Sequence, residues 1–232
     1  MSASADGRMS RALARAAALA VMLAGSALAD GGDGGERIVY RPPAIFGSPA
    51  DETRVGGGTR GAPREALDLN VLAPLSTGLT SRERPTLYWH LSRAVSVPVE
   101  VTVVDPHATD PVLEVRLEPP FPAGVHRLSL AERGTALVPG KVYEWYVAVV
   151  HDPHRRAADT IAGATIMYRD AGPGLTAALA SAPAREHAAL YAREGIWYDA
   201  LDALSRLIDS GSPEMRPVRA ALLEQAQLRI EP

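Results

Sequence analysis

The sequence has 232 residues, of which 47% are hydrophobic and 22% are charged, with no cysteine and a formal net charge of −3. This composition is typical of a globular protein, and it excludes wholesale disorder, disulfide bonds, thiolate nucleophiles and cysteine-based metal sites. Because there is no basic excess, nucleic acid is not an expected partner.

Residues 1–29 have the pattern of a signal peptide. Three arginines precede a short apolar run at residues 16–24, and Ala27-Leu28-Ala29 forms a small-residue cleavage site. The apolar run is shorter than the roughly 20 residues that a transmembrane helix needs. We therefore expect an exported chain, periplasmic or extracellular, that begins at Asp30 and has no stable membrane insertion. An uncleaved membrane anchor is the alternative.

Residues 30–67 are rich in glycine and proline and show no hydrophobic period, which predicts an irregular segment. The run Gly56-Gly57-Gly58-Thr59-Arg60-Gly61 suggests a phosphate-binding loop. It lacks the Gly-Lys-Ser/Thr ending of a P-loop, and no buried strand precedes it. An irregular loop is the preferred interpretation.

Residues 68–170 contain six short runs in which apolar and polar residues alternate, with proline-containing turns between them. Period-2 alternation predicts strands with one buried face and one face in water. Six such strands at this spacing favour an immunoglobulin or fibronectin type III-like antiparallel β-sandwich. The runs are centred on residues 87–91, 97–103, 113–117, 126–130, 143–149 and 161–168.

One local motif supports this fold. The run from Leu137 to Tyr143 resembles the Leu-x-Pro-Gly-x-x-Tyr corner of fibronectin type III domains, in which the tyrosine hydroxyl hydrogen-bonds to upstream backbone. Trp89 and Trp145 then belong to the core, because large aromatic side chains dominate core packing.

Residues 171–232 change to a helical period and predict a helical hairpin module. Residues 188–208 resemble one tetratricopeptide unit, with Gly195, Trp197 and Ala200 as structural residues; a generic hairpin is the alternative. Neighbouring helical residues point about 100° apart, so Tyr198 is expected near the edge of the buried stripe. A single unit leaves apolar surface without a stacked neighbour. We therefore predict an interface for a protein partner, formed by Tyr198, Leu190, Leu207, Arg193 and Arg206.

The chain from about residue 40 to residue 205 is similar to the bacterial family called domain of unknown function 928. The carrying motifs include Tyr40-Arg41-Pro42-Pro43, the glycine-rich loop, Thr77-Gly78-Leu79-Thr80 and, most specifically, the run from Gly195 to Leu201. This resemblance implies an exported protein with no agreed activity. Family members often carry two cysteines where this sequence has Pro63 and His151.

The remaining candidate for chemistry is the run His151-Asp152-Pro153-His154, followed by Asp159. Two histidines and two carboxylates could hold zinc, but Pro153 interrupts the strand and no further histidine is near, so we predict a polar turn without metal. The sequence contains no Gly-x-Ser-x-Gly nucleophile motif. We expect no cofactor and no enzymatic activity, but a cell-envelope interaction or scaffolding module. The alternative is a periplasmic carbohydrate- or metal-binding protein or a hydrolase accessory.

Overall fold

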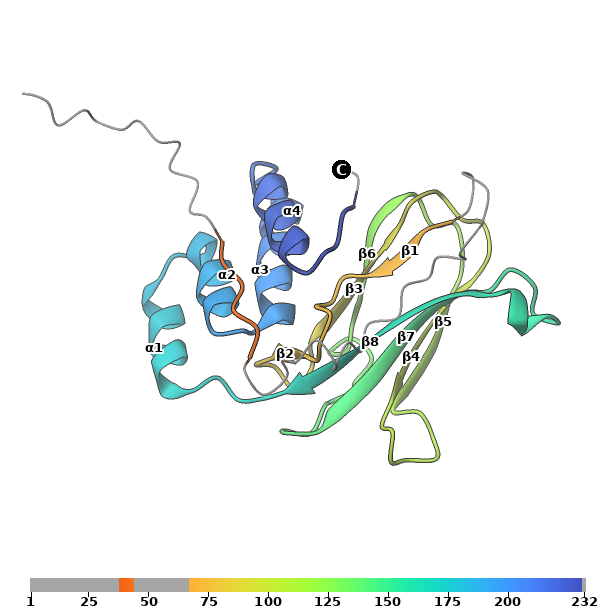
Figure 1. Ribbon diagram of the computed structural model, residues 1–232, viewed down its shortest axis with the longest axis horizontal. Coiled ribbons are helices and arrows are strands. Elements are labelled where there is room, and N and C mark those ends of the chain that lie inside the picture. The colour runs from red at the N-terminus through yellow and green to blue at the C-terminus, as the bar shows by residue number, and fades with distance from the viewer. Residues whose placement is uncertain (1–37, 44–66, 231–232) are drawn as a thin grey trace, which may run out of the picture. The chain divides into compact units, whose positions relative to one another are not determined.

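The computed structural model describes residues 38–43 and 67–230, which belong to one compact unit, Glu36–Pro232 (Figure 1). The described residues form two sheets and four α-helices. The three-stranded sheet has the order β1-β3-β6, and the five-stranded sheet has the order β2-β8-β7-β4-β5. The strands are β1 (Leu69–Val71), β2 (Gly78–Thr80), β3 (Thr86–Leu91), β4 (Val99–Val104), β5 (Leu113–Leu117), β6 (Gly124–Ser129), β7 (Val142–Val149) and β8 (Thr160–Tyr168).

Every second residue of the strands contributes to the core between the sheets, as the alternating sequence pattern predicts. On β4 the three valines at positions 99, 101 and 103 are fully buried, while the residues between them are half-buried. They join Trp145 of β7 and Trp89 of β3 in one hydrophobic cluster to which both sheets contribute. The six predicted strands are therefore present, and their boundaries differ from the expected ones by a few residues.

The expectation of a purely antiparallel arrangement is wrong in one place. The strand β2 runs parallel to β8, with Gly78 opposite Ile166, so the five-stranded sheet is mixed. Both β1 and β2 lie outside the predicted set. Each has only three residues, and this is too short for a period of two to be recognised.

The strand β3 differs from the simple alternating pattern because both of its faces are buried. Leu87, Trp89 and Leu91 point into the core, but Tyr88 and His90 on the other face are only 2% and 6% exposed. Helix α3 (Trp197–Asp209) contacts β3 and β2 and covers this second face. The polar side of the alternation is thus buried beneath a helix and does not face water.

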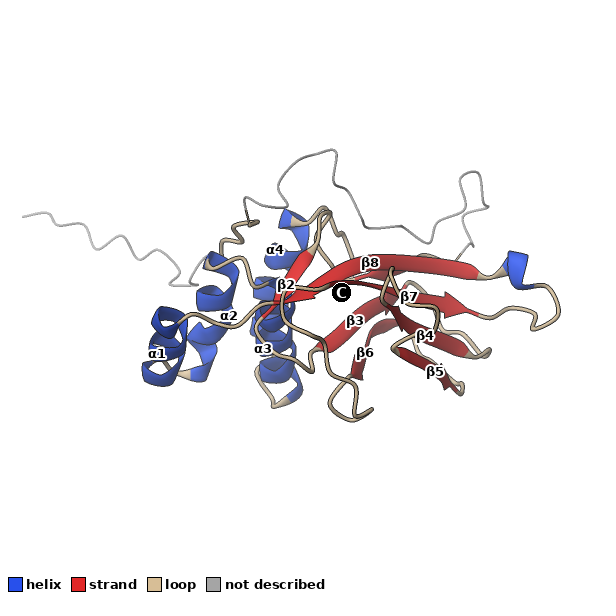
Figure 2. Ribbon diagram, turned by 90° about the horizontal axis from the view of Figure 1, so that it is seen from below, coloured by secondary structure: helices blue, strands red, loops and turns tan. Residues whose placement is uncertain are grey.

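The helices gather beside one end of the sheets (Figures 1 and 2). They are α1 (Pro173–Ser181), α2 (Ala184–Arg193), α3 and α4 (Met215–Gln225), and a short 3-10 helix (Arg156–Ala158) lies between β7 and β8. Helix α3 packs against both α2 and α4. No helix within residues 38–43 and 67–230 is long and apolar enough to cross a membrane.

Residues 38–43, part of the segment predicted to be irregular, have no regular secondary structure but are anchored on the helices. The Arg41 N–H donates to the Ala192 carbonyl at the end of α2. The Gln225 side chain at the end of α4 accepts from the Tyr40 N–H and donates to the Ile38 carbonyl, at 2.8 and 3.0 Å. The glycine-rich loop at residues 56–61 lies outside the described residues.

Candidate functional site

The turn between α2 and α3 joins the helices to the sheets. Gly195 has a φ of +75°, and a Cβ there would lie 2.7 Å from the Arg41 carbonyl oxygen. A residue with a side chain would be strained in this left-handed conformation and would collide with the backbone. Trp197, which follows two residues later, is fully buried and donates from Nε1 to the Leu72 carbonyl at 2.9 Å. The glycine therefore allows the chain to turn so tightly that α3 begins against the sheet.

Tyr198 is a core residue, and its prediction as an interface residue is wrong. Its side chain is 1% exposed. Its hydroxyl accepts from Trp145 Nε1 at 2.8 Å and donates to the Thr165 carbonyl at 3.1 Å. The fit is close, because a Cβ on Gly78 would lie 2.6 Å from the Tyr198 ring. The side chain does point away from the face of Trp197, but the five-stranded sheet covers this second face.

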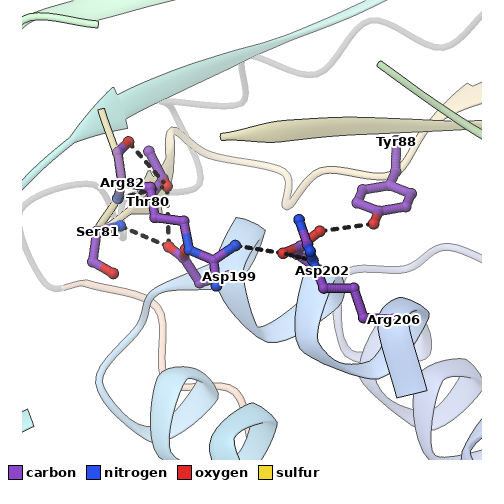
Figure 3. A network of polar contacts seen from close by, with 7 residues as sticks. All are labelled: Thr80, Ser81, Arg82, Tyr88, Asp199, Asp202 and Arg206. Carbon is purple, nitrogen blue, oxygen red and sulfur yellow. Dashed lines mark hydrogen bonds and ion pairs between the residues drawn. The ribbon is translucent and has the colours of Figure 1, made fainter. Parts of the chain in front are cut away.

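Two buried carboxylates follow on the same helix and bind the loop after β2. Asp199 accepts from the Ser81 N–H at 2.6 Å and the Thr80 hydroxyl at 3.0 Å, and it pairs with Arg82 Nε at 3.0 Å. Arg82 also reaches Asp202, so one guanidinium bridges both acids (Figure 3). Asp199 and Asp202 are 1% and 2% exposed.

Asp202 connects this cluster to β3. Its carboxylate accepts from the Tyr88 hydroxyl at 2.9 Å and from Arg206 Nε at 2.7 Å (Figure 3). A buried charge is tolerated when it is paired and its remaining lone pairs accept hydrogen bonds. Because both acids meet this condition, the cluster fixes α3 against β2 and β3.

The two acids have opposite pKa shifts. Burial raises the pKa of Asp199, and the nearby Asp202 adds to this effect, against the donors from Ser81, Arg82 and Thr80. Burial also acts to raise the pKa of Asp202, but the hydrogen bonds from Tyr88, Arg206 and Arg82 outweigh it and hold the pKa below its usual value. Donors occupy both carboxylates, and the chain screens both from solvent. The cluster thus fixes the position of α3, which forms one side of an adjacent groove.

This groove lies between the outer face of β3 and β6 and the helices α3 and α4. It contains a cavity of about 600 Å³, which is within the range of about 300–1,000 Å³ typical of ligand pockets. A second hollow of about 320 Å³ shares Tyr88, Arg127 and Asp209 with the first and extends the groove toward Ser129 and Arg206. We call the two together the β6–α4 groove. The larger cavity is lined by Tyr88, His90, Ala123, Gly124, Val125, His126, Arg127, Ser205, Ile208, Asp209, Arg216, Arg219 and Ile230.

Positive charge dominates the larger cavity. Arg127 pairs with Asp209 across the groove. Arg216 and Arg219, one turn apart on α4, form no ion pair within the described part of the chain, and the only hydrogen bond from Arg219 goes to the Ser205 hydroxyl at 3.5 Å. Burial and the neighbouring Arg216 lower the pKa of Arg219, and Asp209 opposes this effect. The cavity therefore contains two guanidinium groups that lack a carboxylate partner among the described residues.

The family comparison covers both the cluster and the groove. The model of the family described as Domain of Unknown Function (DUF928) matches residues 55–230. The chain belongs to the DUF928 family. The match includes every strand and helix of the described structure. No curated protein matches the sequence.

The other residues that the sequence of this DUF928 chain singled out differ in how deeply they are buried. Trp89, Trp145 and Ala200 are buried, and the Tyr143 hydroxyl accepts from the Val138 N–H at 3.2 Å, which is the contact that the corner motif predicts. Among the predicted interface residues, Arg206 lines the smaller hollow while paired with Asp202. Leu190 and Leu207 are half-buried, and Arg193 is exposed. Their role as an interface stays a prediction.

The candidate zinc segment forms a turn at the far end of β7. His151 contacts the Thr160 hydroxyl at 3.0 Å, and Asp152 accepts from the backbone N–H of His154 at 2.9 Å. Asp159 pairs with Arg156 at 2.7 Å. Nowhere in residues 38–43 and 67–230 do three or more histidine, aspartate or glutamate side chains gather as a metal site would require.

Sequence reasoning did not identify the residues that make the groove. Tyr88 and His90 fell on the polar side of an alternating strand, and Arg216 and Arg219 lie in the part of the helical module beyond residue 208, for which no role was predicted. One signal was available: the recurrence of arginine at a spacing of three on one helix, which places two like charges side by side. Such a pair is unfavourable in isolation, and this marks it as a candidate binding feature.

Proposed function

We propose that this DUF928 chain is an exported, non-catalytic binding module of the cell envelope, and that it holds a protein partner in the β6–α4 groove. We further propose that its sheets form an immunoglobulin or fibronectin type III-like sandwich and that α2 and α3 correspond to one tetratricopeptide-like unit. The Tyr143 corner contact supports the first assignment. The packing of α2 against α3 around Ala188, Trp197 and Leu201 supports the second.

One observation carries the binding role: an open, polar groove that rigid elements hold on both sides. The buried acids of α3 bind Tyr88 of β3 and Arg82 of the loop after β2, so the helix side and the sheet side of the groove are connected. A site on strands and helices whose side chains are already fixed loses little entropy when a ligand binds. Asp202 and Asp209, two carboxylates that line the groove, are occupied by donors, and this favours binding over acid–base chemistry.

Cross-linking inside cells tests this proposal. A photo-reactive amino acid replaces Ala123, an exposed residue that lines the cavity, and in a matched strain it replaces Glu114, an exposed residue on β5. We expect an adduct with one envelope protein from position 123 and none from position 114. An absence of adducts at both positions, or equal adducts at both, would contradict a partner in the groove.

A further inference from the structure

The charge and shape of the β6–α4 groove identify the chemistry of the partner segment, an inference that rests on the proposed function. We propose that the groove binds an extended acidic peptide segment alongside β6, with its carboxylates at Arg216 and Arg219. Three independent features of the groove support this assignment.

The first feature is charge. Arg216 is exposed and Arg219 is half-buried, and neither has a carboxylate within ion-pair distance in the described part of the chain. Asp209, which lies near Arg219, is engaged by Arg127. Guanidinium groups bind carboxylates through paired, charge-assisted hydrogen bonds, and such bonds are stronger where solvent access is reduced. An arriving carboxylate would relieve the repulsion between the two arginines.

The second feature is a buried polar side chain at the same cavity. His90 is 6% exposed, and no described residue hydrogen-bonds to its Nδ1. A polar group of this kind usually has a partner in a folded protein. His90 lines the cavity together with the arginines, so its ring adds a polar group to the wall, while its Nδ1 itself is closed to solvent.

The third feature is the edge of the sheet. Within the described residues, β6 pairs with β3 on one side only. The cavity is lined by five consecutive residues of this region, from Ala123 to Arg127, so residues from both faces of β6 border it. An extended peptide can add to such an edge through backbone hydrogen bonds. A free small anion would not use this edge, and therefore the observations favour a peptide.

The geometry of β6 determines the length and the side-chain pattern of a suitable peptide probe. The strand β6 has six residues, and it would align with a peptide of the same length, which spans about 20 Å. Alternate residues of a strand point to one face, so a Glu-Thr-Glu-Thr-Glu-Thr peptide presents all its carboxylates together. A Gln-Thr-Gln-Thr-Gln-Thr peptide has the same shape without charge. An N-methylated version of the acidic peptide removes alternate backbone donors but keeps the carboxylates.

Fluorescence anisotropy with the purified full chain measures the binding of labelled peptides. We expect the acidic peptide to bind at least about tenfold more tightly than the glutamine peptide, since hydrogen bonds to charged groups exceed neutral ones by this much. The N-methylated peptide should bind more weakly than its parent. Inorganic phosphate and glutarate, each alone, should compete poorly at the concentration at which the peptide saturates.

Variants locate the site. Arg216→Gln and Arg219→Gln should each weaken the acidic peptide about tenfold and leave the glutamine peptide unchanged. Arg185→Gln, which replaces an exposed arginine of α2 that does not line the groove, is the control and should have no effect. Arg219 is half-buried, so melting curves check that its variant is folded; Arg216 is exposed, and its variant carries the test if the other unfolds.

The inference is overturned if the two peptides bind equally, if the Arg216 variant binds like the parent, or if glutarate competes as well as the peptide. These failures differ from failure of the proposed function. A cross-link at position 123 without any charge preference in vitro would leave a binding module whose partner segment is not acidic. The absence of that cross-link would contradict the proposed binding function itself.

Discussion

Replacing Tyr198 by phenylalanine tests the structural role of the α2–α3 turn most sharply. The substitution keeps the ring that fills the space next to Gly78 and removes only the hydroxyl. Trp145 Nε1 then loses the acceptor that it has at 2.8 Å, in a place where Trp145 is fully buried. The helices and the five-stranded sheet lose two hydrogen bonds that connect them, from Trp145 Nε1 and to the Thr165 carbonyl, while the packing changes little.

The expected cost follows from the unsatisfied donor. A buried polar group that loses its partner destabilises a protein by about 1–3 kcal/mol. For a chain of this size, each kcal/mol lowers the melting temperature by about 2–4 °C. We therefore expect Tyr198→Phe to melt about 2–12 °C below the parent. Tyr198→Ala, which also leaves a cavity, should cost about 3–5 kcal/mol.

A double-mutant cycle separates the hydrogen bond from other effects. Trp145→Phe removes the donor, so in that background Tyr198→Phe should cost clearly less than it does alone. Tyr168→Phe is the matched control, because the Tyr168 hydroxyl bonds to Asp170 at the surface. Equal melting temperatures for the parent and Tyr198→Phe would refute the buried contact. Strict additivity in the cycle would refute the coupling between the two rings.

Three further results are expected. Tyr143→Phe removes the acceptor of the Val138 N–H and should lower the free energy of unfolding by about 1–3 kcal/mol; an unchanged denaturation midpoint would contradict the corner contact. Burial, with the charges of His126 and Arg219, lowers the pKa of His90 against the effect of Asp68. Below about pH 6.5 the unfolded chain therefore binds a proton that the native chain does not, and stability falls as the pH falls. As the pH falls through this window, the melting temperature of His90→Gln should decline less than that of the parent. An equal decline in both would count against the burial effect. His154→Gln, which replaces an exposed histidine, is the control. Finally, N-terminal sequencing of protein from the envelope fraction should begin at Asp30; retention of residues 16–24 would contradict export by cleavage.

The local patterns predicted the elements well where the period is long enough to read. The valines of β4 repeat every second residue, and the apolar positions of α3 repeat every three or four, so each element and its core face could be predicted. The same reasoning failed at Tyr198. A helical wheel shows that this residue points away from Trp197, but it does not show whether water or a sheet lies on that side.

The candidate site could be predicted even less, because its parts are polar and far apart in the chain. Asp199 was part of a motif singled out in the sequence, but its partner Ser81 lies 118 residues earlier. Arg82, Tyr88 and Asp202 had no distinguishing spacing at all. Polar residues on strands and helices are usually solvated, and this general tendency predicted the wrong environment for Tyr88 and His90.

By itself, the sequence determined the type, the order and the approximate bounds of the longer elements, since hydrophobic periodicity and turn residues act within a few residues of the chain. It also determined the family, through motifs such as the run from Gly195 to Leu201. Only the tertiary structure decided which second faces are buried and where unpartnered charges meet. The contact of Trp197 with Leu72 spans 125 residues, and no local pattern specifies such a pairing. The helices pack on β2 and β3 where Trp197 and Tyr198 are buried and where Asp199 and Asp202 find donors, and the groove lies beside α4.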